Sequence, residues 1–203
     1  MSERLIIAID CDDVLIPTAE AIIAAYNRDY GTNLQLKDFY STARHEAWGT
    51  NDEKVAIDRV GLFLRSEEHA RIKPDLEAIA AVGRLALKHE LHLVTGRSDY
   101  LESITKAMLG RYFPECFTSI EHTNYFEGQR KRSKGEVCAQ LKADVLIDDH
   151  IAHGESVLAS GLKEVIVFGD YPWNQAQSLP QGMTRCADWQ VTEEEIGRIS
   201  HGR

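Results

Sequence analysis

Short apolar runs alternate with segments of helical period along most of this 203-residue chain, and no other feature limits its fold as strongly. Apolar runs of a few residues, bounded by polar or turn residues, are typical of buried strands. When such strands alternate with helices, they usually form a parallel sheet that helices cover. The pattern predicts strands at 5–9, 91–94, 117–120, 145–147 and 165–168.

Residues 17–73 break this alternation, because they contain two helical stretches, at 19–30 and 52–65, and no predicted strand. An interval of this length exceeds an ordinary crossover between parallel strands. We therefore expect residues 17–73 to form a helical insert above the carboxyl edge of the sheet. Further helices are predicted at 76–87, at 101–112, at 133–141 and, on the surface, from 193–195 onward.

Charge and cysteine usage exclude several classes of protein. The formal net charge is −9, from 23 basic and 32 acidic residues, which argues against a nucleic-acid binder because such proteins need a basic surface. No apolar run approaches the roughly 18 residues of a membrane span, and the run at 5–9 is too short for a signal peptide. Four separated cysteines indicate free thiols in a cytoplasmic protein: Cys11, Cys116, Cys138 and Cys186.

Three carboxylates, Asp10, Asp12 and Asp13, lie within four residues directly after the first predicted strand. Carboxylates this close repel one another unless a cation lies among them, and oxygen ligands favour Mg²⁺. A calcium loop of the EF-hand type is excluded, because its sixth and twelfth positions would be Leu15 and Ala21 rather than Gly and Glu. A solvated acidic turn is the alternative to a metal site.

A second acidic pair, Asp148 and Asp149, follows the strand predicted at 145–147. Ligands of an open parallel sheet bind beyond the carboxyl ends of its strands, so we expect both acidic groups to face one crevice. An Asp-Asp turn by itself is more typical of a surface. Its coincidence with the carboxylates after the first strand favours a shared metal site.

Two further segments suit the binding of a phosphate group. The strand predicted at 91–94 leads through Thr95 and Gly96 into a helix, and a helix start presents free N–H groups to an anion. A basic run at 130–134 ends in Lys134, in the first turn of a predicted helix. A cation opposes the helix dipole there, so we expect an anion or a carboxylate beside Lys134.

Together these elements resemble the haloacid dehalogenase (HAD) superfamily of phosphohydrolases. The four motifs of that superfamily are similar to residues 10–15, Thr95, Lys134 and 148–149, in this order. The resemblance implies a Rossmann-like three-layer α/β/α core, formed by 1–16 and 74–203, with strand order 3-2-1-4-5. It also implies a small helical cap of the C1 type at 17–73.

A narrower resemblance is to the 5′(3′)-deoxyribonucleotidases (5′ nucleotidase, deoxy, cytosolic type C) and their bacterial relatives. It rests on the stretch from Asp13 to Gly31, on Arg132-x-Lys134, and on 171–174 with Trp189. The chain differs in having Gly96 where the mammalian enzymes have Ser. Its segment 38–41 and Trp48 match the base-binding aromatics of that family only loosely.

The resemblance implies a Mg²⁺-dependent phosphomonoesterase, a 5′-nucleotidase for (deoxy)ribonucleoside monophosphates. Asp10 would be the nucleophile that forms an aspartyl-phosphate, and Asp12 would be the acid and base, which requires a raised pKa. Mg²⁺ would be held by Asp10, the Asp12 carbonyl and Asp149, with Asp148 as a second, water-mediated or direct partner. The phosphoryl oxygens would contact Thr95, Gly96, Lys134 and Arg132.

Other side chains near these motifs have two interpretations each. Phe39, Tyr40 and Trp48 could stack on a base or could only pack the cap. Cys11 is expected to be an inert core residue. His150 and His153 could form a metal pair, but a solvated helix start is favoured.

Alternative functions remain open on the sequence. The substrate could be another small phosphorylated metabolite, or a terminal phosphate on a nucleic acid, which the basic run at 130–134 would suit. A phosphate-binding HAD module without activity is a third alternative. The sequence does not determine the base or sugar preference, or whether the protein forms a homodimer.

Overall fold

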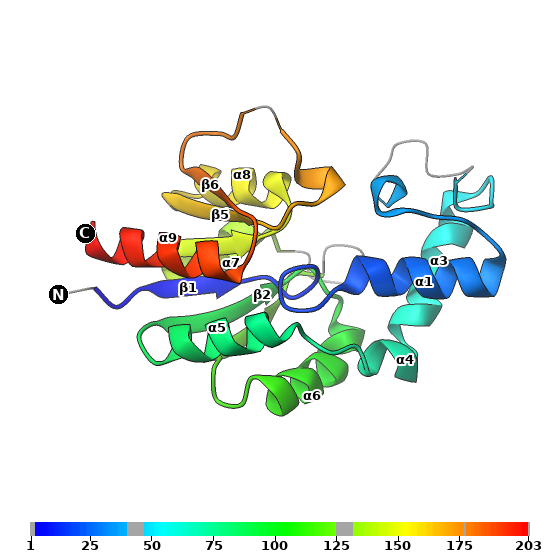
Figure 1. Ribbon diagram of the computed structural model, residues 1–203, viewed down its shortest axis with the longest axis horizontal. Coiled ribbons are helices and arrows are strands. Elements are labelled where there is room, and N and C mark those ends of the chain that lie inside the picture. Colours follow the sequence, from blue (N-terminus) through cyan, green and yellow to red (C-terminus); the bar gives the residue numbers. More distant parts are fainter. Residues whose placement is uncertain (1–2, 40–46, 125–131, 177, 203) are drawn as a thin grey trace.

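The computed structural model describes residues 3–39, 47–124, 132–176 and 178–202 (Figure 1). Within this part of the chain, one parallel sheet has the strand order β3-β2-β1-β4-β5-β6. The predicted order 3-2-1-4-5 is confirmed, and a sixth strand extends it at one edge. The strands are β1 (Ile6–Ile9), β2 (Glu90–Thr95), β3 (Ser119–His122), β4 (Val145–Asp148), β5 (Glu164–Phe168) and β6 (Met183–Cys186).

The sequence pattern does not predict β6, since two of its residues, Thr184 and Arg185, are polar. The strand pairs with β5, in parallel register, and lies at the edge of the sheet that the described residues form. An edge strand has one neighbour and less burial, so it does not require the continuous apolar run of a central strand.

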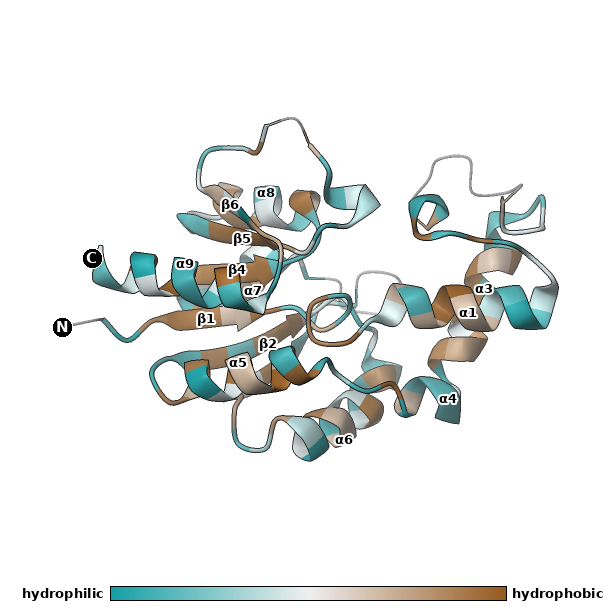
Figure 2. Ribbon diagram, in the orientation of Figure 1, coloured by the Kyte–Doolittle hydropathy of each residue, from teal (hydrophilic) through white to brown (hydrophobic). Residues whose placement is uncertain are grey.

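Helices cover both faces of the sheet and make the molecule three-layered (Figure 1). On the strands, Ile7 and Ile9 join one apolar cluster with α5, α6 and α9, whereas Ala8 joins another with α7 and α8. Strands buried on both faces are mostly apolar, as Figure 2 shows for β1 and for β4 up to Ile147. These helices are α5 (Leu76–Ala86), α6 (Glu102–Tyr112), α7 (Lys134–Leu141), α8 (Ile151–Ala159) and α9 (Trp189–His201).

Capping side chains set several helix starts. Ser133 and Glu136 form a capping box at the start of α7. The last helix, by contrast, begins earlier than 193–195 and is not only a surface helix. The Asp188 side chain accepts a hydrogen bond from the Val191 N–H, so this cap, and not the acidic run, starts α9. α9 then buries Trp189 and other apolar residues in the core.

The helical segment at 18–70 stands apart from the sheet, on the side where the strands end and away from both termini (Figure 1). It contains α1 (Thr18–Tyr30), η1 (Leu36–Asp38), α3 (Glu53–Leu64) and α4 (Glu67–Ala70). α1 ends at Gly31, which has a φ of 64°, a left-handed conformation that favours glycine. The segment has an apolar cluster of its own, with the buried residues Ile22, Tyr26, Leu34, Trp48 and Ala56.

All four cysteines are free thiols. No helix in the described ranges is long and apolar enough to cross a membrane.

Candidate active site

The carboxyl ends of β1 and β4 bring five aspartates together. β1 and β4 are neighbours in parallel register, and the Asp10 N–H donates to the Ile147 carbonyl at 2.9 Å. Asp10 therefore lies beside the end of β4, where Asp148 and Asp149 follow. Four of the five side chains are buried, and Asp12 is partly exposed: Asp10, Asp12, Asp13, Asp148 and Asp149.

A tight turn after β1 directs Asp12 and Asp13 to different partners. Asp13 has a φ of 58°, and its N–H donates to the Ile16 carbonyl at 2.7 Å. The Asp13 carboxylate accepts a hydrogen bond from the Ala19 N–H of α1 at 2.9 Å. Burial raises the pKa of Asp13 to about 8, and the charges of Asp12 and Asp10 add to this shift. Cys11 is fully buried in the core, as expected for an inert thiol.

Lys134 links the two strand ends. It is the first residue of α7, and its Nζ lies 2.7 Å from Asp10 Oδ2 and 2.6 Å from Asp148 Oδ2. The cation at this helix start is thus balanced by carboxylates, one of the two partners that the sequence led us to expect. Burial raises the pKa of Asp10 to about 6, with Asp148 and Asp12 adding to the shift and Lys134 opposing it.

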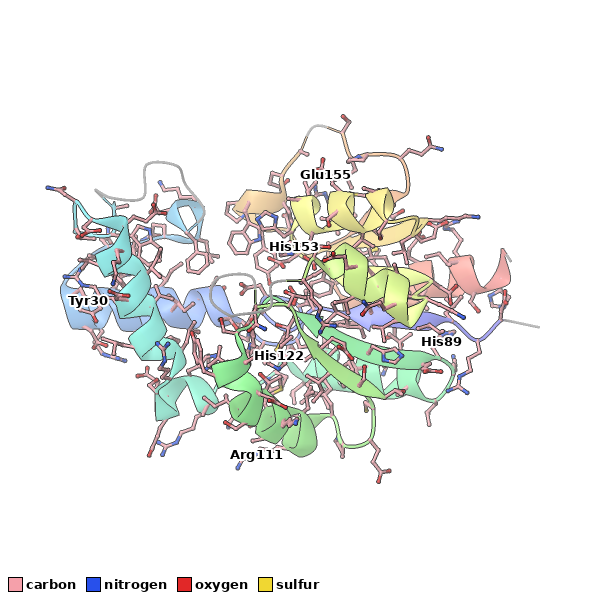
Figure 3. All side chains as sticks on the ribbon, turned by 180° about the vertical axis from the view of Figure 1, so that it is seen from behind. Tyr30, His89, Arg111, His122, His153 and Glu155 are labelled. Carbon is pink, nitrogen blue, oxygen red and sulfur yellow. The ribbon has the colours of Figure 1, made fainter. Side chains whose placement is uncertain are left out.

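His153 does not belong to a solvated helix start, contrary to the favoured interpretation. Its side chain is half-buried on α8, and its Nδ1 lies 2.9 Å from Asp148 Oδ1 (Figure 3). α8 begins directly after the acidic pair, so its first turn faces the end of β4. Burial would raise the pKa of Asp148, but Lys134 and His153 outweigh burial and hold it below the usual range.

Asp10, Asp148 and His153 place ligand atoms within 4.8 Å of one another, which could suit a metal ion. The ammonium of Lys134 lies against both of these carboxylates, however, and it is the cation that balances them here. Asp149 is in a different position. Its Oδ2 accepts a hydrogen bond from the Trp173 indole N–H at 2.7 Å, and Trp173 brings no charge.

Among the described residues, too little positive charge faces Asp149 and Asp13. Burial raises the pKa of Asp149 well above its usual value, and the charges of Asp148, Asp10 and Asp13 raise it further. Three of the five carboxyl groups thus have raised pKa values beside Lys134 and Arg97. Buried carboxylate oxygens with uncompensated charge form a donor set that fits a divalent cation.

Arg97, to which the sequence pattern assigns no role, forms a two-pronged ion pair with Asp12. Its Nε lies 2.9 Å from Asp12 Oδ2, its Nη2 lies 2.7 Å from Oδ1, and Thr18 also donates to Oδ1. Burial raises the pKa of Asp12, but the Arg97 charge and these hydrogen bonds outweigh burial and lower the pKa to about 2. The raised pKa expected for Asp12 is therefore not found. The two residues are 85 positions apart, so no local pattern indicates the pair.

Thr95 and Gly96 lie at the end of β2, beside β1. The Thr95 side chain is buried, and its Oγ1 accepts a hydrogen bond from the Arg97 N–H at 3.2 Å. Arg132 is held at the end of β3, where its Nη2 lies 3.0 Å from Glu121 Oε2 and donates to the His122 carbonyl at 3.2 Å. Residues 130 and 131 of the basic run lie outside the described residues.

The cap aromatics have different surroundings. Trp48 is buried, and its ring packs edge-on against Tyr26 at 4.8 Å, so it belongs to the interior of the helical segment. Phe39 is half-buried and lies between Trp48, at 5.8 Å, and Trp173, at 6.1 Å. Trp173 is on η3 (Pro172–Asn174), so Phe39 reaches from the helical segment to the connection that follows β5. Tyr40 lies outside the described residues.

Two cavities in the described part of the chain lie away from the carboxylates. One, of about 610 Å³, is lined by Leu158, Gly182 and Arg198 among others, beside β6. The other, of about 150 Å³, lies within the helical segment beside Tyr26 and Arg59. Charge and burial mark the candidate site.

Comparisons with solved structures show the same fold in HAD hydrolases. A haloacid dehalogenase-like hydrolase from Streptococcus pneumoniae has a TM-score of 0.69 at 11% identity, covering 95% of this chain and 98% of that one. A protein from Clostridium acetobutylicum described as a predicted phosphatase has a TM-score of 0.65 at 16% identity, with coverages of 96% and 99%. A protein from Bacillus subtilis classed as a HAD hydrolase and solved with bound magnesium has a TM-score of 0.62 at 11% identity, with coverages of 96% and 99%.

The sequence itself matches a protein family over almost its whole length. Residues 4–200 match the family described as 5′ nucleotidase, deoxy (pyrimidine), cytosolic type C protein (NT5C). No curated protein sequence matches the chain. With this match, the HAD-like fold and the paired carboxylates at two strand ends, the chain belongs to the NT5C family of the HAD superfamily and is a hydrolase of phosphoric monoesters.

Proposed function

We propose that this hydrolase is a Mg²⁺-dependent 5′-nucleotidase that removes phosphate from (deoxy)ribonucleoside monophosphates through an aspartyl-phosphate on Asp10. The observation that carries the proposal is the pairing of a buried Asp10 with Lys134 beside a second, charge-poor carboxylate, Asp149. The family description names a 5′ nucleotidase, which supports a nucleotide over other small phosphorylated substrates.

Asp10 has the features of a nucleophile. One oxygen accepts the Cys11 N–H at 2.8 Å and the other lies against Lys134, so both carboxylate oxygens have a set direction. With a pKa of about 6, Asp10 is largely ionised near neutral pH. A phosphomonoester dianion repels an anionic nucleophile, and Lys134 reduces this repulsion.

The residues that would hold Mg²⁺ are Asp10, Asp149 and the backbone carbonyl of Asp12. Asp148 is the poorer direct ligand, because Lys134, His153 and the His150 N–H already use its two oxygens. Mg²⁺ bound there would supply positive charge to the phosphoryl group. The Bacillus subtilis protein of the same fold, solved with magnesium, supports this cation.

In the proposed reaction, Asp10 forms a bond to phosphorus as the bond to the nucleoside oxygen breaks, and Asp12 gives a proton to that oxygen. Water then attacks the aspartyl-phosphate while Asp12 takes the proton back, which releases phosphate and restores Asp10. Thr95, Gly96 and Lys134 would bind the phosphoryl oxygens, with Arg132 at the neighbouring strand end. Because Arg97 keeps Asp12 ionised, the structure suits the second step better than the first.

We further propose that residues 17–73 act as a cap over a core of 1–16 and 74–203. The separate apolar cluster of the helical segment and its position at the carboxyl edge of the sheet support this division. Phe39, which meets Trp173 at the boundary, is then the cap aromatic best placed to contact a base. The cytosolic family description supports a cytoplasmic location.

The test is a panel of phosphomonoesters assayed for phosphate release with Mg²⁺ and with a chelator. We expect nucleoside monophosphates to react at least about tenfold faster, in kcat/KM, than sugar phosphates, and the chelator to stop the reaction. Comparable rates on sugar phosphates and nucleotides would contradict the nucleotidase. Full activity with the chelator would contradict the metal.

A further inference from the structure

The connection after β5 holds the end of β4 through Asn174. The Asn174 side chain is fully buried, and its amide nitrogen donates to the Phe168 carbonyl at 2.9 Å and to the Asp149 carbonyl at 3.1 Å. An amide NH2 has two hydrogens, which these two bonds occupy, and the Gly169 carbonyl lies farther away, at 3.4 Å. Asn174 therefore joins the last residue of β5 to the main chain of Asp149, directly after β4.

Arg185 of β6 holds Asn174 in turn. Its Nη1 lies 2.7 Å from Asn174 Oδ1, and its Nη2 donates to the Asn174 carbonyl. A guanidinium has donors only, so the oxygen of the Asn174 amide must face Arg185. The NH2 then faces the carbonyls of Phe168 and Asp149. One of the polar residues that interrupt the apolar pattern of β6 thus fixes the direction of a buried amide.

The same connection also contacts the Asp149 side chain. Trp173, next to Asn174, donates to Asp149 Oδ2 at 2.7 Å. Its ring stacks on Tyr171, with centroids 4.6 Å apart and planes 6° from parallel. Gly169 has a φ of 80°, and a Cβ there would collide with the Tyr171 ring, so glycine leaves room for this stack. Consecutive residues of one connection therefore hold both the main chain and the carboxylate of Asp149.

Asn174 lies between Arg185 and Asp149 in this network. We infer that Arg185 is a positioning residue that, through Asn174, sets the place and orientation of Asp149 for Mg²⁺. The inference rests on the proposed function, in which Asp149 is a ligand of Mg²⁺. A ligand that is ordered before the cation arrives loses less conformational freedom on binding, so the network should increase the affinity for Mg²⁺.

The charge of Arg185 and its positioning effect predict opposite changes in this affinity. A cation repels Mg²⁺, so its removal strengthens Mg²⁺ binding if charge alone matters. If Arg185 positions Asp149, its removal weakens Mg²⁺ binding. Asn174→Asp gives the same contrast. It adds a negative charge, which attracts Mg²⁺, but it removes the NH2 that donates to the two carbonyls.

The test measures the Kd of Mg²⁺ for the metal-free protein by isothermal titration calorimetry. We expect Arg185→Met and Asn174→Asp each to raise the Kd about tenfold. The rise in Tm that a fixed Mg²⁺ concentration causes should become smaller in both variants. In Arg185→Met the Mg²⁺ concentration for half-maximal phosphate release should also rise about tenfold, while kcat at saturating Mg²⁺ changes less than about threefold.

Two control variants separate positioning from charge and from stability. Arg198→Met removes a cation of α9 that pairs with Glu195, away from the carboxyl ends of the strands, and should leave the Kd within about twofold of the wild type. Ile196→Val removes one carbon from the core beneath α9 and should lower the Tm of the metal-free protein without changing the Kd.

Unchanged or tighter Mg²⁺ binding in Arg185→Met or in Asn174→Asp would overturn the inference, and so would an equal weakening in Ile196→Val. The two variants break the same contact from its two sides, so either one that folds decides the question. If the wild type binds no Mg²⁺ and releases phosphate in the presence of a chelator, the proposed function fails and the inference fails with it. A wild type that binds and requires Mg²⁺, with variants that bind it as tightly, refutes the inference alone.

Discussion

The ends of β1 and β4 carry similar acidic groups, yet neighbouring carboxylates within each end have opposite electrostatic states. Asp148 and Asp149 are 1% and 4% exposed, but the pKa of Asp148 is lowered and that of Asp149 is raised. Asp148 faces Lys134 and His153, whereas Asp149 has an indole N–H. Burial is the same for both, so the cationic partner decides the sign of the shift.

The same contrast occurs after β1, with a different cation. Asp12 is paired with the fork of Arg97, while Asp13 accepts a backbone N–H, and their pKa values are about 2 and about 8. Asp10 shares Lys134 with Asp148, and its pKa of about 6 is intermediate. Within each strand end, the carboxylate with a cationic partner of its own has the lower pKa.

Of all these changes, removing the charge of Asp10 should have the largest effect. Asp10→Asn removes the nucleophile, so we expect phosphate release to fall at least about 1,000-fold. The measurement is kcat on a nucleoside monophosphate with saturating Mg²⁺. Asp170→Asn makes the same change at an exposed residue after β5 and should retain activity. Turnover that persists in Asp10→Asn would refute the nucleophile.

Substituting Asp148 and Asp149 one at a time should separate the role of each residue. Asp149→Asn should raise the Mg²⁺ concentration for half-maximal activity about 100-fold, without loss of stability in the metal-free protein. Asp148→Asn should instead lower the free energy of unfolding by about 3 kcal/mol, since Lys134 loses one buried partner. Mg²⁺ titrations and denaturant unfolding measure the two effects. The reverse pattern would make Asp148 the direct ligand.

The carboxyl groups with raised pKa values should also make the free energy of unfolding depend on pH. Asp10 and Asp13 have a higher pKa in the folded protein than the value of 3.8 in the unfolded chain. Such a group stabilises the folded protein fully below pH 3.8. The stabilisation is lost as the pH rises from 3.8 through the pKa of the folded protein. His69, whose pKa burial lowers to about 4, has the opposite effect, but only up to the unfolded pKa of 6.5. Above that pH, Asp13 remains to be ionised, up to about pH 8, and Asp149, whose pKa is also raised, acts in the same direction.

We therefore expect the free energy of unfolding of the metal-free protein to fall by roughly 2 kcal/mol between pH 6.5 and 8. Mg²⁺ should reduce this fall, and Asp13→Asn should make it smaller, with Asp149 accounting for the remainder. Denaturant unfolding across this pH range is the measurement. Stability that stays constant or rises in the metal-free wild type would show that Asp13 already has a compensating cation.

Changing the neutral partner of Asp149 should have the smallest effect. Trp173→Phe keeps most of the ring contact with Phe39 and Tyr171 but loses the N–H that orients Asp149. We expect the affinity for Mg²⁺ to become about tenfold weaker, and kcat to be restored at high Mg²⁺ concentration. Activity against Mg²⁺ concentration measures this. A lower kcat at saturating Mg²⁺ would mean that Trp173 acts on more than the metal ligand.

Local patterns predict most of the sheet and of its helices. β1, β2, β4 and β5 begin within one residue of the predicted runs, because a buried central strand needs a continuous apolar stretch. Edge strand β6 carries no such run and is not predicted. Capping side chains mark the start of α7, but the Asp188 cap places α9 earlier than the acidic run does.

The sequence by itself determined the order of strands and helices, the helical segment after β1 and the meeting of two acidic groups at neighbouring strand ends. These follow from residues close together in the chain and from the geometry of parallel sheets. Only the tertiary structure decided which carboxylate receives which cation. Arg97 reaches Asp12 across 85 residues, and Lys134 joins two separate strands. Such contacts depend on side-chain direction after packing, and no periodicity in the chain records that direction.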